Sequence, residues 1–189
     1  MTPLPLIVGI GGTTRAGSTS EQALKTALAH ASALGCDTLL FPGPQLPSEI
    51  YDPTQLQRSE SAAALVSALR RADGVIIATP AYHGGLSGLV KNALDFTEDL
   101  RSDARVYLEG RAVGCIVCAE GAQAMGSTLA SLRAIVHALR GWPTPYGATL
   151  NSANRPFGSE DQAADAAAIQ ACHTVAEQVV EFARMRLHR

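Results

Sequence analysis

A short segment near the amino terminus combines glycines, hydroxyl side chains and one arginine. It covers residues 11–20 with the sequence GGTTRAGSTS, between an apolar run and a stretch of helix-forming residues. Free N–H groups and the helix dipole at such a position favour an anion, and Arg15 adds a guanidinium suited to phosphate. A loop that only caps the helix is the simpler alternative, but five hydroxyl groups and an arginine exceed what one cap needs. The segment therefore predicts a phosphate site.

The kind of phosphate follows from residues that the segment lacks. A P-loop needs a lysine after its second glycine, and Ser18 stands at that position, which argues against nucleotide hydrolysis. The dinucleotide fingerprint fails as well, because Thr14 occupies the place of its third glycine. A hydroxyl-rich loop suits a single terminal phosphomonoester better than a pyrophosphate. FMN carries such a phosphate.

Two further segments follow predicted strands. Residues 79–88 (TPAYHGGLSG) contain Pro80, which stiffens the exit from the strand, and glycines that allow close approach to a flat ligand. Their N–H groups could bind a polar ring edge, and Tyr82 and His83 could stack on a ring or line a substrate pocket. His83 could equally face solvent, and the sequence offers it no partner for a general-acid role.

The other segment, residues 119–126, joins small residues to two glycines, which again suits a ligand edge. Glu120 could belong to the site or be a solvated loop charge, and the sequence leaves both open. Just before it, Cys115 and Cys118 form a C-x-x-C within an apolar strand. Residues three apart on a strand are about 10 Å apart and face opposite sides, so we expect core cysteines rather than a disulfide or a metal site.

These segments need a scaffold of alternating strands and helices. The pattern predicts strands at 4–10, 38–41, 74–79, 112–118 and 144–148, and helices at 18–34, 59–72, 87–97, 126–139 and 160–187. Right-handed crossovers place such helices on both faces of a parallel sheet. Ligands of these sheets bind at the carboxyl ends of the strands, where the loops after the first, third and fourth strands meet.

Composition narrows the class of protein. The chain has 189 residues with a net charge of -2, 47% hydrophobic and 17% charged residues. We expect one domain, residues 1–189, with its own core. The charge balance disfavours nucleic-acid binding, no apolar run is long enough for a membrane span, and no signal peptide is recognisable. A cytoplasmic location is expected.

Together the segments resemble the NAD(P)H-dependent FMN reductase family, a flavodoxin-like group. The first matches G-[ST]-x-R-x-x-S over residues 12–18. The second matches [ST]-P-x-Y at residues 79–82 and G-x-x-K-[NT]-x-L-D at residues 88–95. The lead-in ADGVIIA at residues 72–78 and the pairs Leu46-Pro47 and Tyr51-Asp52 are also similar to the family. The resemblance covers about residues 4–140.

The resemblance implies an α/β fold with a five-stranded parallel sheet in the order 2-1-3-4-5. It implies FMN as cofactor, NADPH or NADH as co-substrate, and hydride transfer from nicotinamide to flavin N5, with no side chain in a catalytic role. The electrons would pass to a flavin, a quinone or another small acceptor. The implied cofactor-binding residues are Thr13, Arg15, Ser18, Thr19, Ser20, Pro80, Ala81, Tyr82, His83, Gly84, Glu120 and Gly121.

The resemblance also implies a homodimer or homotetramer, and a flavin-dependent monooxygenase is a conceivable recipient of reduced FMN. Lys91 and Asp95 belong to the motif but are expected to be structural. Ala81, His83 and Glu120 depart from the residues common in the family, which leaves the acceptor open. The alternatives are a flavodoxin-type electron carrier, disfavoured by the low net charge, and a ligand-sensing relative that has lost flavin.

Overall fold

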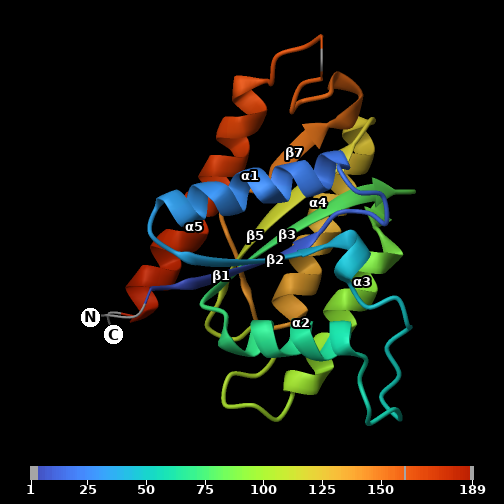
Figure 1. Cartoon of the computed structure of the whole chain (residues 1–189), viewed down its shortest axis with the longest axis vertical. Helices are drawn as coiled ribbons and strands as arrows, with labels where there is room; N and C mark the ends of the chain where they lie inside the picture. Colours follow the sequence, from blue (N-terminus) through green and yellow to red (C-terminus); the bar gives the residue numbers. More distant parts are fainter. Residues whose placement is uncertain (1–3, 160, 188–189) are drawn as a thin grey trace.

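A parallel β-sheet forms the centre of the computed structural model, which describes residues 4–159 and 161–187 (Figure 1). Its adjacent strands are, in spatial order, β2 (Asp37–Pro42), β1 (Leu6–Gly11), β3 (Gly74–Tyr82) and β5 (Ala112–Ala119). Two short strands follow on the far side of β5: β6 (Trp142–Pro143) pairs with its beginning and β7 (Ala148–Asn151) with its end. The short β4 (Gly85–Leu86) runs antiparallel to the end of β3.

The predicted five-stranded sheet is therefore correct in type and wrong in detail. The sheet has seven strands, with the path β2-β1-β3-β5-β6 and with β4 and β7 off that path. The single strand predicted at 144–148 is replaced by β6 and β7, because Pro143 and Pro145 have no N–H to donate to a ladder. The hairpin of β3 and β4 was missed because its second strand is only two residues long and one of them is a glycine.

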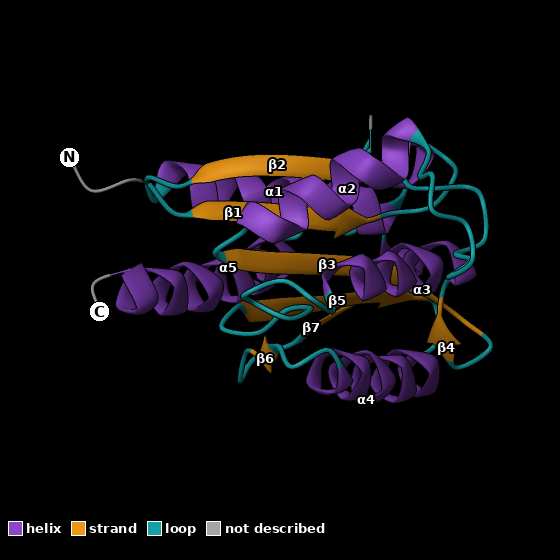
Figure 2. Ribbon diagram, turned by 90° about the horizontal axis from the view of Figure 1, so that it is seen from below, coloured by secondary structure: helices purple, strands orange, loops and turns teal. Residues whose placement is uncertain are grey.

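Helices cover both faces of the sheet (Figure 2). α1 (Thr19–Ala33) and α5 (Ala166–Leu187) pack on one face, and α2 (Glu60–Arg71), α3 (Gly88–Asp95) and α4 (Ala122–Ala138) on the other. Cys115 is buried in the core beneath α2, α3 and α4, and Cys118 in the core beneath α1 and α5. This confirms that the two cysteines face opposite sides, and both are free thiols.

The helix boundaries differ from prediction mainly in the last third of the chain. α4 begins at Ala122 rather than at 126, so its first turn includes most of the segment predicted to be a loop. The predicted start of the last helix at 160 lies outside the described residues, and α5 begins at Ala166. Short 3-10 turns occur at η1 (Gly43–Gln45), η2 (Phe96–Leu100) and η3 (Ser152–Asn154). Within the described ranges, no helix is both long and apolar enough to cross a membrane.

The register of the strands brings their carboxyl ends to one edge. Gly11 pairs with Ala78, and Pro80 lies opposite Cys118. Across β5 and β7, Ala119 pairs with Asn151. The segments after β1, β3, β5 and β7 consequently emerge side by side, and any site that they form spans four strands.

Candidate functional site

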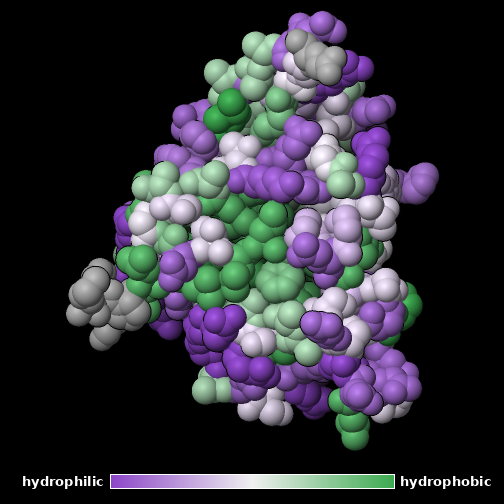
Figure 3. All heavy atoms as spheres, viewed as in Figure 1, coloured by the Kyte–Doolittle hydropathy of each residue, from purple (hydrophilic) through white to green (hydrophobic). Residues whose placement is uncertain are grey.

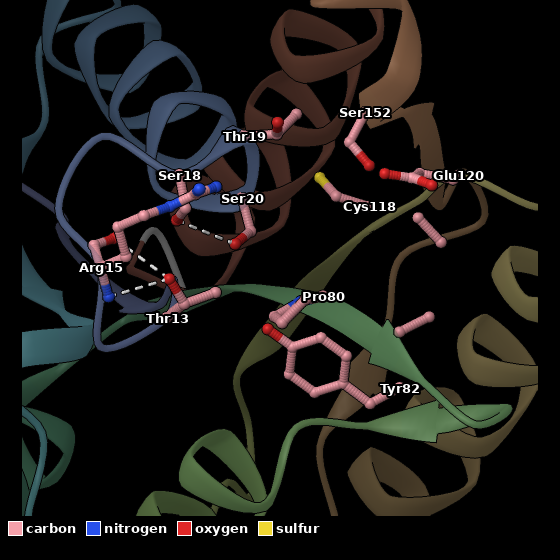
Figure 4. A pocket seen from close by; sticks show the side chains of 12 residues that line it. Thr13, Arg15, Ser18, Thr19, Ser20, Pro80, Tyr82, Cys118, Glu120 and Ser152 are labelled. Carbon is pink, nitrogen blue, oxygen red and sulfur yellow. Dashed lines mark hydrogen bonds between the residues drawn. The ribbon is translucent and has the colours of Figure 1, made fainter.

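A cleft of about 440 Å³ opens at this edge of the sheet (Figure 4). Its volume lies in the range typical of small-molecule sites. Four segments supply its walls, and the lining residues are Thr13, Arg15, Ser18, Thr19, Ser20, Pro80, Ala81, Tyr82, Cys118, Ala119, Glu120 and Ser152.

The cleft brings together most of the residues predicted from the sequence. Nine of the predicted cofactor-binding residues line it, whereas His83, Gly84 and Gly121 do not. His83 and Gly84 form the tip of the β3–β4 hairpin, and Gly121 is the exposed N-cap of α4. Cys118, Ala119 and Ser152 were missed. Ser152 reaches the cleft because it directly follows Asn151, the partner of Ala119 in the sheet, and no motif in the sequence marks it.

The first loop, residues 12–18, is held in shape by the side chain of Thr13 and by two side chains of α1. The Thr13 hydroxyl accepts a hydrogen bond from the N–H of Arg15 at 3.1 Å. Gly17 is fixed on both sides: its N–H donates to Glu21 Oε2 at 3.1 Å, and its carbonyl accepts from Gln22 Nε2 at 2.8 Å. Gly17 has a φ of 71°, a backbone conformation that suits glycine. These contacts restrict the conformations that the loop can adopt.

Glu21 is a buried carboxylate next to this loop, and it is compensated locally. It is 4% exposed and pairs with Lys25 one turn along α1. Because Lys25 and the Gly17 N–H both face this carboxylate, it opposes an incoming anion less than an unpaired charge would.

The beginning of α1 offers unused hydrogen-bond donors. Ser18 is the N-cap, and its Oγ accepts from the N–H of Glu21 at 3.4 Å. Among the described residues, the N–H groups of Thr19 and Ser20 have no acceptor. The hydroxyls of Ser18 and Ser20 lie 3.4 Å apart, and Arg15 is exposed beside them (Figure 4). This set matches the needs of a terminal phosphate.

Close contact between β1 and β3 forms the floor below the first loop. The N–H of Gly12 donates to the Ala78 carbonyl at 3.1 Å. A Cβ on Gly11 would overlap that same carbonyl, so only glycine fits there. The glycine pair thus lets the chain leave the strand tightly and turn into the cleft.

The β3–β4 hairpin forms a second wall. His83 and Gly84 have φ values of 52° and 81°, so they form a tight turn with both central residues in the left-handed region. His83 is exposed, and histidine is one of the few residues besides glycine that are enriched in this conformation. Tyr82 is 54% exposed, and its ring extends from the hairpin toward the first loop (Figure 4). The hairpin also contacts α4, where Ser127 Oγ donates to the Gly84 carbonyl at 3.3 Å.

The rest of the second motif is structural. The Thr79 hydroxyl accepts from the N–H of Ser87 at 3.1 Å, which closes the segment between β3 and α3. Asn92 on α3 donates to the carbonyls of Pro47 and Glu49 and accepts from the N–H of Tyr51 at 2.9 Å.

Lys91 and Asp95, the other polar residues of the motif, form an ion pair along α3 at 2.6 Å and do not line the cleft.

The third loop, Glu120 and Gly121, joins β5 to α4. No side chain caps α4, since its N-cap is Gly121. Burial raises the pKa of the nearby Cys118 thiol to about 12, so this thiol is neutral at physiological pH and is not a nucleophile. Glu120 is exposed and lies beside Ser152, at the end of the cleft away from Arg15 (Figure 4).

The fold and the position of the cleft define a flavodoxin-like α/β protein. Solved structures with this architecture include an oxidoreductase from Corynebacterium diphtheriae (TM-score 0.72, 19% identity, covering 98% of this chain and 99% of that one). The flavoenzyme FerB from Paracoccus denitrificans, an NAD(P)H:(acceptor) oxidoreductase, gives a TM-score of 0.73 at 17% identity, covering 97% and 99% of the two chains. At such identities the likeness shows the fold alone.

The family follows from the sequence match. The family model described as NADPH-dependent FMN reductase matches residues 5–155, and the chain belongs to that family. A curated relative, an NADPH azoreductase from Bacillus sp. (strain OY1-2), is 40% identical over 48 residues. That match spans 25% of this chain and about a quarter (27%) of the relative.

Proposed function

We propose that the cleft binds FMN, with its phosphate at the first loop and its ring between the hairpin and the third loop. The observation that carries this proposal is the set of unused donors at the start of α1. Thr19 and Ser20 offer free N–H groups beside Arg15, at one end of a cleft that extends over three further strand ends. Phosphate recognition at one end leaves the remainder, lined by Pro80 and Tyr82, for a flat ring.

We further propose an FMN-dependent NAD(P)H oxidoreductase. When bound, FMN supplies the hydride acceptor at its N5. The overall reaction for a quinone is balanced: NADPH, a proton and the quinone give NADP⁺ and the hydroquinone. The chain's own part is to fix the phosphate through the first loop, to hold the ring edge with backbone groups near Ala81, and to leave one face open beside Tyr82.

Family membership and the names of the relatives support this activity. The relatives include an enzyme named for NADPH and one named for NAD(P)H with an unspecified acceptor.

The test is an anaerobic mixing experiment. The protein is loaded with FMN, freed of unbound flavin, and mixed with NADPH or NADH while the visible absorbance of the flavin is followed. We expect the absorbance to bleach, and to return on addition of a quinone or of free FMN. If the protein retains flavin but neither NADPH nor NADH bleaches it, the result would indicate the electron-carrier alternative. If the protein retains no flavin, the result would contradict both the oxidoreductase and the carrier functions.

We also propose that the protein acts as a homo-oligomer in the cytoplasm. Ile50 and Leu56 are 81% and 96% exposed on a segment whose backbone is held by Asn92 and Arg58. A rigid segment that presents aliphatic side chains suits a protein interface. Light scattering at several concentrations tests the oligomeric state.

The four free cysteines support the proposed location in the cytoplasm, which is a reducing compartment.

A further inference from the structure

The charges that line the cleft lie at opposite ends of it. Arg15 and Glu120 are the only charged side chains among the described lining residues. Arg15 is on the first loop, and Glu120 is across the cleft beside Ser152 (Figure 4). The two ends therefore present opposite fields to a ligand.

Glu120 has no cationic partner in the described part of the chain. No lysine, arginine or histidine nitrogen lies within 4.0 Å of its carboxylate, whereas other acids such as Asp99 and Asp103 are paired. Ser152, which lines the same cleft, is uncharged and leaves the charge of Glu120 in place. A full negative charge therefore faces this end of the cleft.

Binding of the cofactor would cancel the positive field at the Arg15 end and leave the cleft negative overall. A phosphate monoester carries a charge of about -1.5 to -2 at neutral pH, and Arg15 offsets about one of these charges. The loaded cleft then has a negative balance, with Glu120 contributing at the end farthest from the phosphate. Pro80 and the exposed Tyr82 ring line the open side, and an aromatic ring can pack against a planar molecule there.

We propose, building on the FMN oxidoreductase function, that Glu120 is a specificity-determining residue that makes the cleft favour neutral or cationic electron acceptors over anionic ones. Planar quinones without ionised groups, and cationic dyes, are the chemical classes that this arrangement accepts best. Two electrons leave the reduced cofactor, and a quinone takes them with two protons to form the hydroquinone. The carboxylate takes no part in this transfer and acts only through its field.

The test separates acceptor choice from nicotinamide use. The FMN-loaded protein is reduced by light with EDTA and mixed with either hexaammineruthenium(III), a tripositive acceptor, or ferricyanide, a trinegative one. In the Glu120→Gln variant we expect the ratio of the ruthenium rate constant to the ferricyanide rate constant to fall about fivefold at an ionic strength of about 0.01 M. This difference between the ratios of the variant and of the unmodified protein should disappear at about 1 M salt, where screening is nearly complete.

A second readout does not depend on turnover. Because a nearby carboxylate disfavours the accumulation of negative charge on the reduced ring, Glu120→Gln should shift the midpoint potential of bound FMN to more positive values. Glu60→Gln is the matched control: Glu60 is also an exposed acid at the start of a helix, but it lies outside the cleft. Glu60→Gln should leave the ratio of the two rate constants and the midpoint potential of bound FMN unchanged.

The simpler role for Glu120 is to stabilise α4 through the helix dipole. That role predicts a small loss of thermal stability in Glu120→Gln with no change in the ratio of rate constants, and such a result would overturn the proposal. An equal change in Glu60→Gln would overturn it as well, since net charge alone would then suffice. If NADPH fails to reduce retained FMN, only the oxidoreductase function is lost, because light supplies the electrons here. Failure to retain FMN overturns both the oxidoreductase function and the proposed role of Glu120.

Discussion

The first and third loops stand at opposite ends of one cleft and are built in opposite ways. In the first loop, side chains fix the backbone: Gly17 is bonded on both sides, and Ser18 caps α1. In the third loop, Glu120 and Gly121 receive no such support, and α4 begins without a side-chain cap. The space-filling view shows one face of the molecule, with a continuous hydrophobic area at its centre and hydrophilic side chains around it (Figure 3).

The difference indicates that the two loops have separate roles in binding. A preformed loop loses little conformational entropy on binding, so it suits a constant group such as a phosphate. A loop with few internal contacts can adjust to ligands of different shape, and it carries the unpaired carboxylate that we assign to acceptor choice. The affinity for FMN should therefore depend mainly on the first loop, and the selectivity among electron acceptors mainly on the third loop.

The largest effect is expected at Arg15. Arg15→Ala removes a charge-assisted bond to the phosphate, so FMN should bind about 1.5–3 kcal/mol more weakly. Riboflavin, which lacks the phosphate, should bind equally well to both proteins. Fluorescence titrations of the two flavins measure this. An unchanged FMN affinity would show that the first loop does not bind the phosphate.

Ser18 and Ser59 form a matched pair of helix caps. Each Oγ accepts from an N–H three residues further on, Ser18 at the cleft and Ser59 at α2. Replacing either by alanine should cost about 1 kcal/mol of stability, which lowers Tm by about 2–4 °C.

Only Ser18→Ala should also weaken FMN binding, by about tenfold or 1.4 kcal/mol, because only Ser18 lines the cleft. Equal FMN affinities of the two variants would contradict the proposed role of this end of the cleft.

A smaller effect is expected from the support of Gly17. Gln22→Ala removes the bond to the Gly17 carbonyl, and FMN affinity should fall by about 0.5–1.5 kcal/mol as the loop loses its shape. Isothermal titration should show a less favourable binding entropy. If affinity and entropy both remain at wild-type values, the loop is not preorganised by this contact.

At the third loop, a cap can be added instead of removed. Gly121→Ser gives α4 an N-cap and should raise the free energy of unfolding by only a few tenths of a kcal/mol. FMN affinity should be unaffected, and chemical denaturation together with a flavin titration checks both. A substantial loss of affinity would mean that the third loop positions the phosphate end as well.

The smallest effect is expected at Cys118, which lines the cleft but is 3% exposed. Since burial holds its pKa near 12, the thiol should resist iodoacetamide at pH 8 with and without FMN. Mass spectrometry of the treated protein measures this. Rapid labelling in the folded state would contradict the burial of this side chain.

Much of the fold and of the cleft could be predicted from the sequence, for reasons that differ between elements. Strands such as β3 and β5 are uninterrupted apolar runs, and the loops that follow them carry glycine and hydroxyl residues, so their order and their meeting point were predictable. The last strand was not, because Pro143 and Pro145 divide it in a way that only the pairing with β5 reveals. Ser152 was missed because no local motif marks it and its place follows only from the pairing of β7 with β5.

The hairpin shows a second limit of sequence reasoning. His83 was expected to border the ring, but the turn that it forms with Gly84 places it outside the cleft lining. Few residues other than glycine adopt such backbone angles, although histidine is enriched among those that do, so residue preference alone did not indicate this turn. Asn92 likewise belongs to a motif but supports the segment around Tyr51.

The most direct test of the central claim is the ratio of the dissociation constants of riboflavin and FMN for the unmodified protein. The two ligands differ only in the phosphate, which we assign to the free donors of Thr19 and Ser20 and to Arg15. Charge-assisted bonds to that group predict that FMN binds at least about tenfold more tightly. Equal affinities would contradict the assignment of the first loop as the phosphate site.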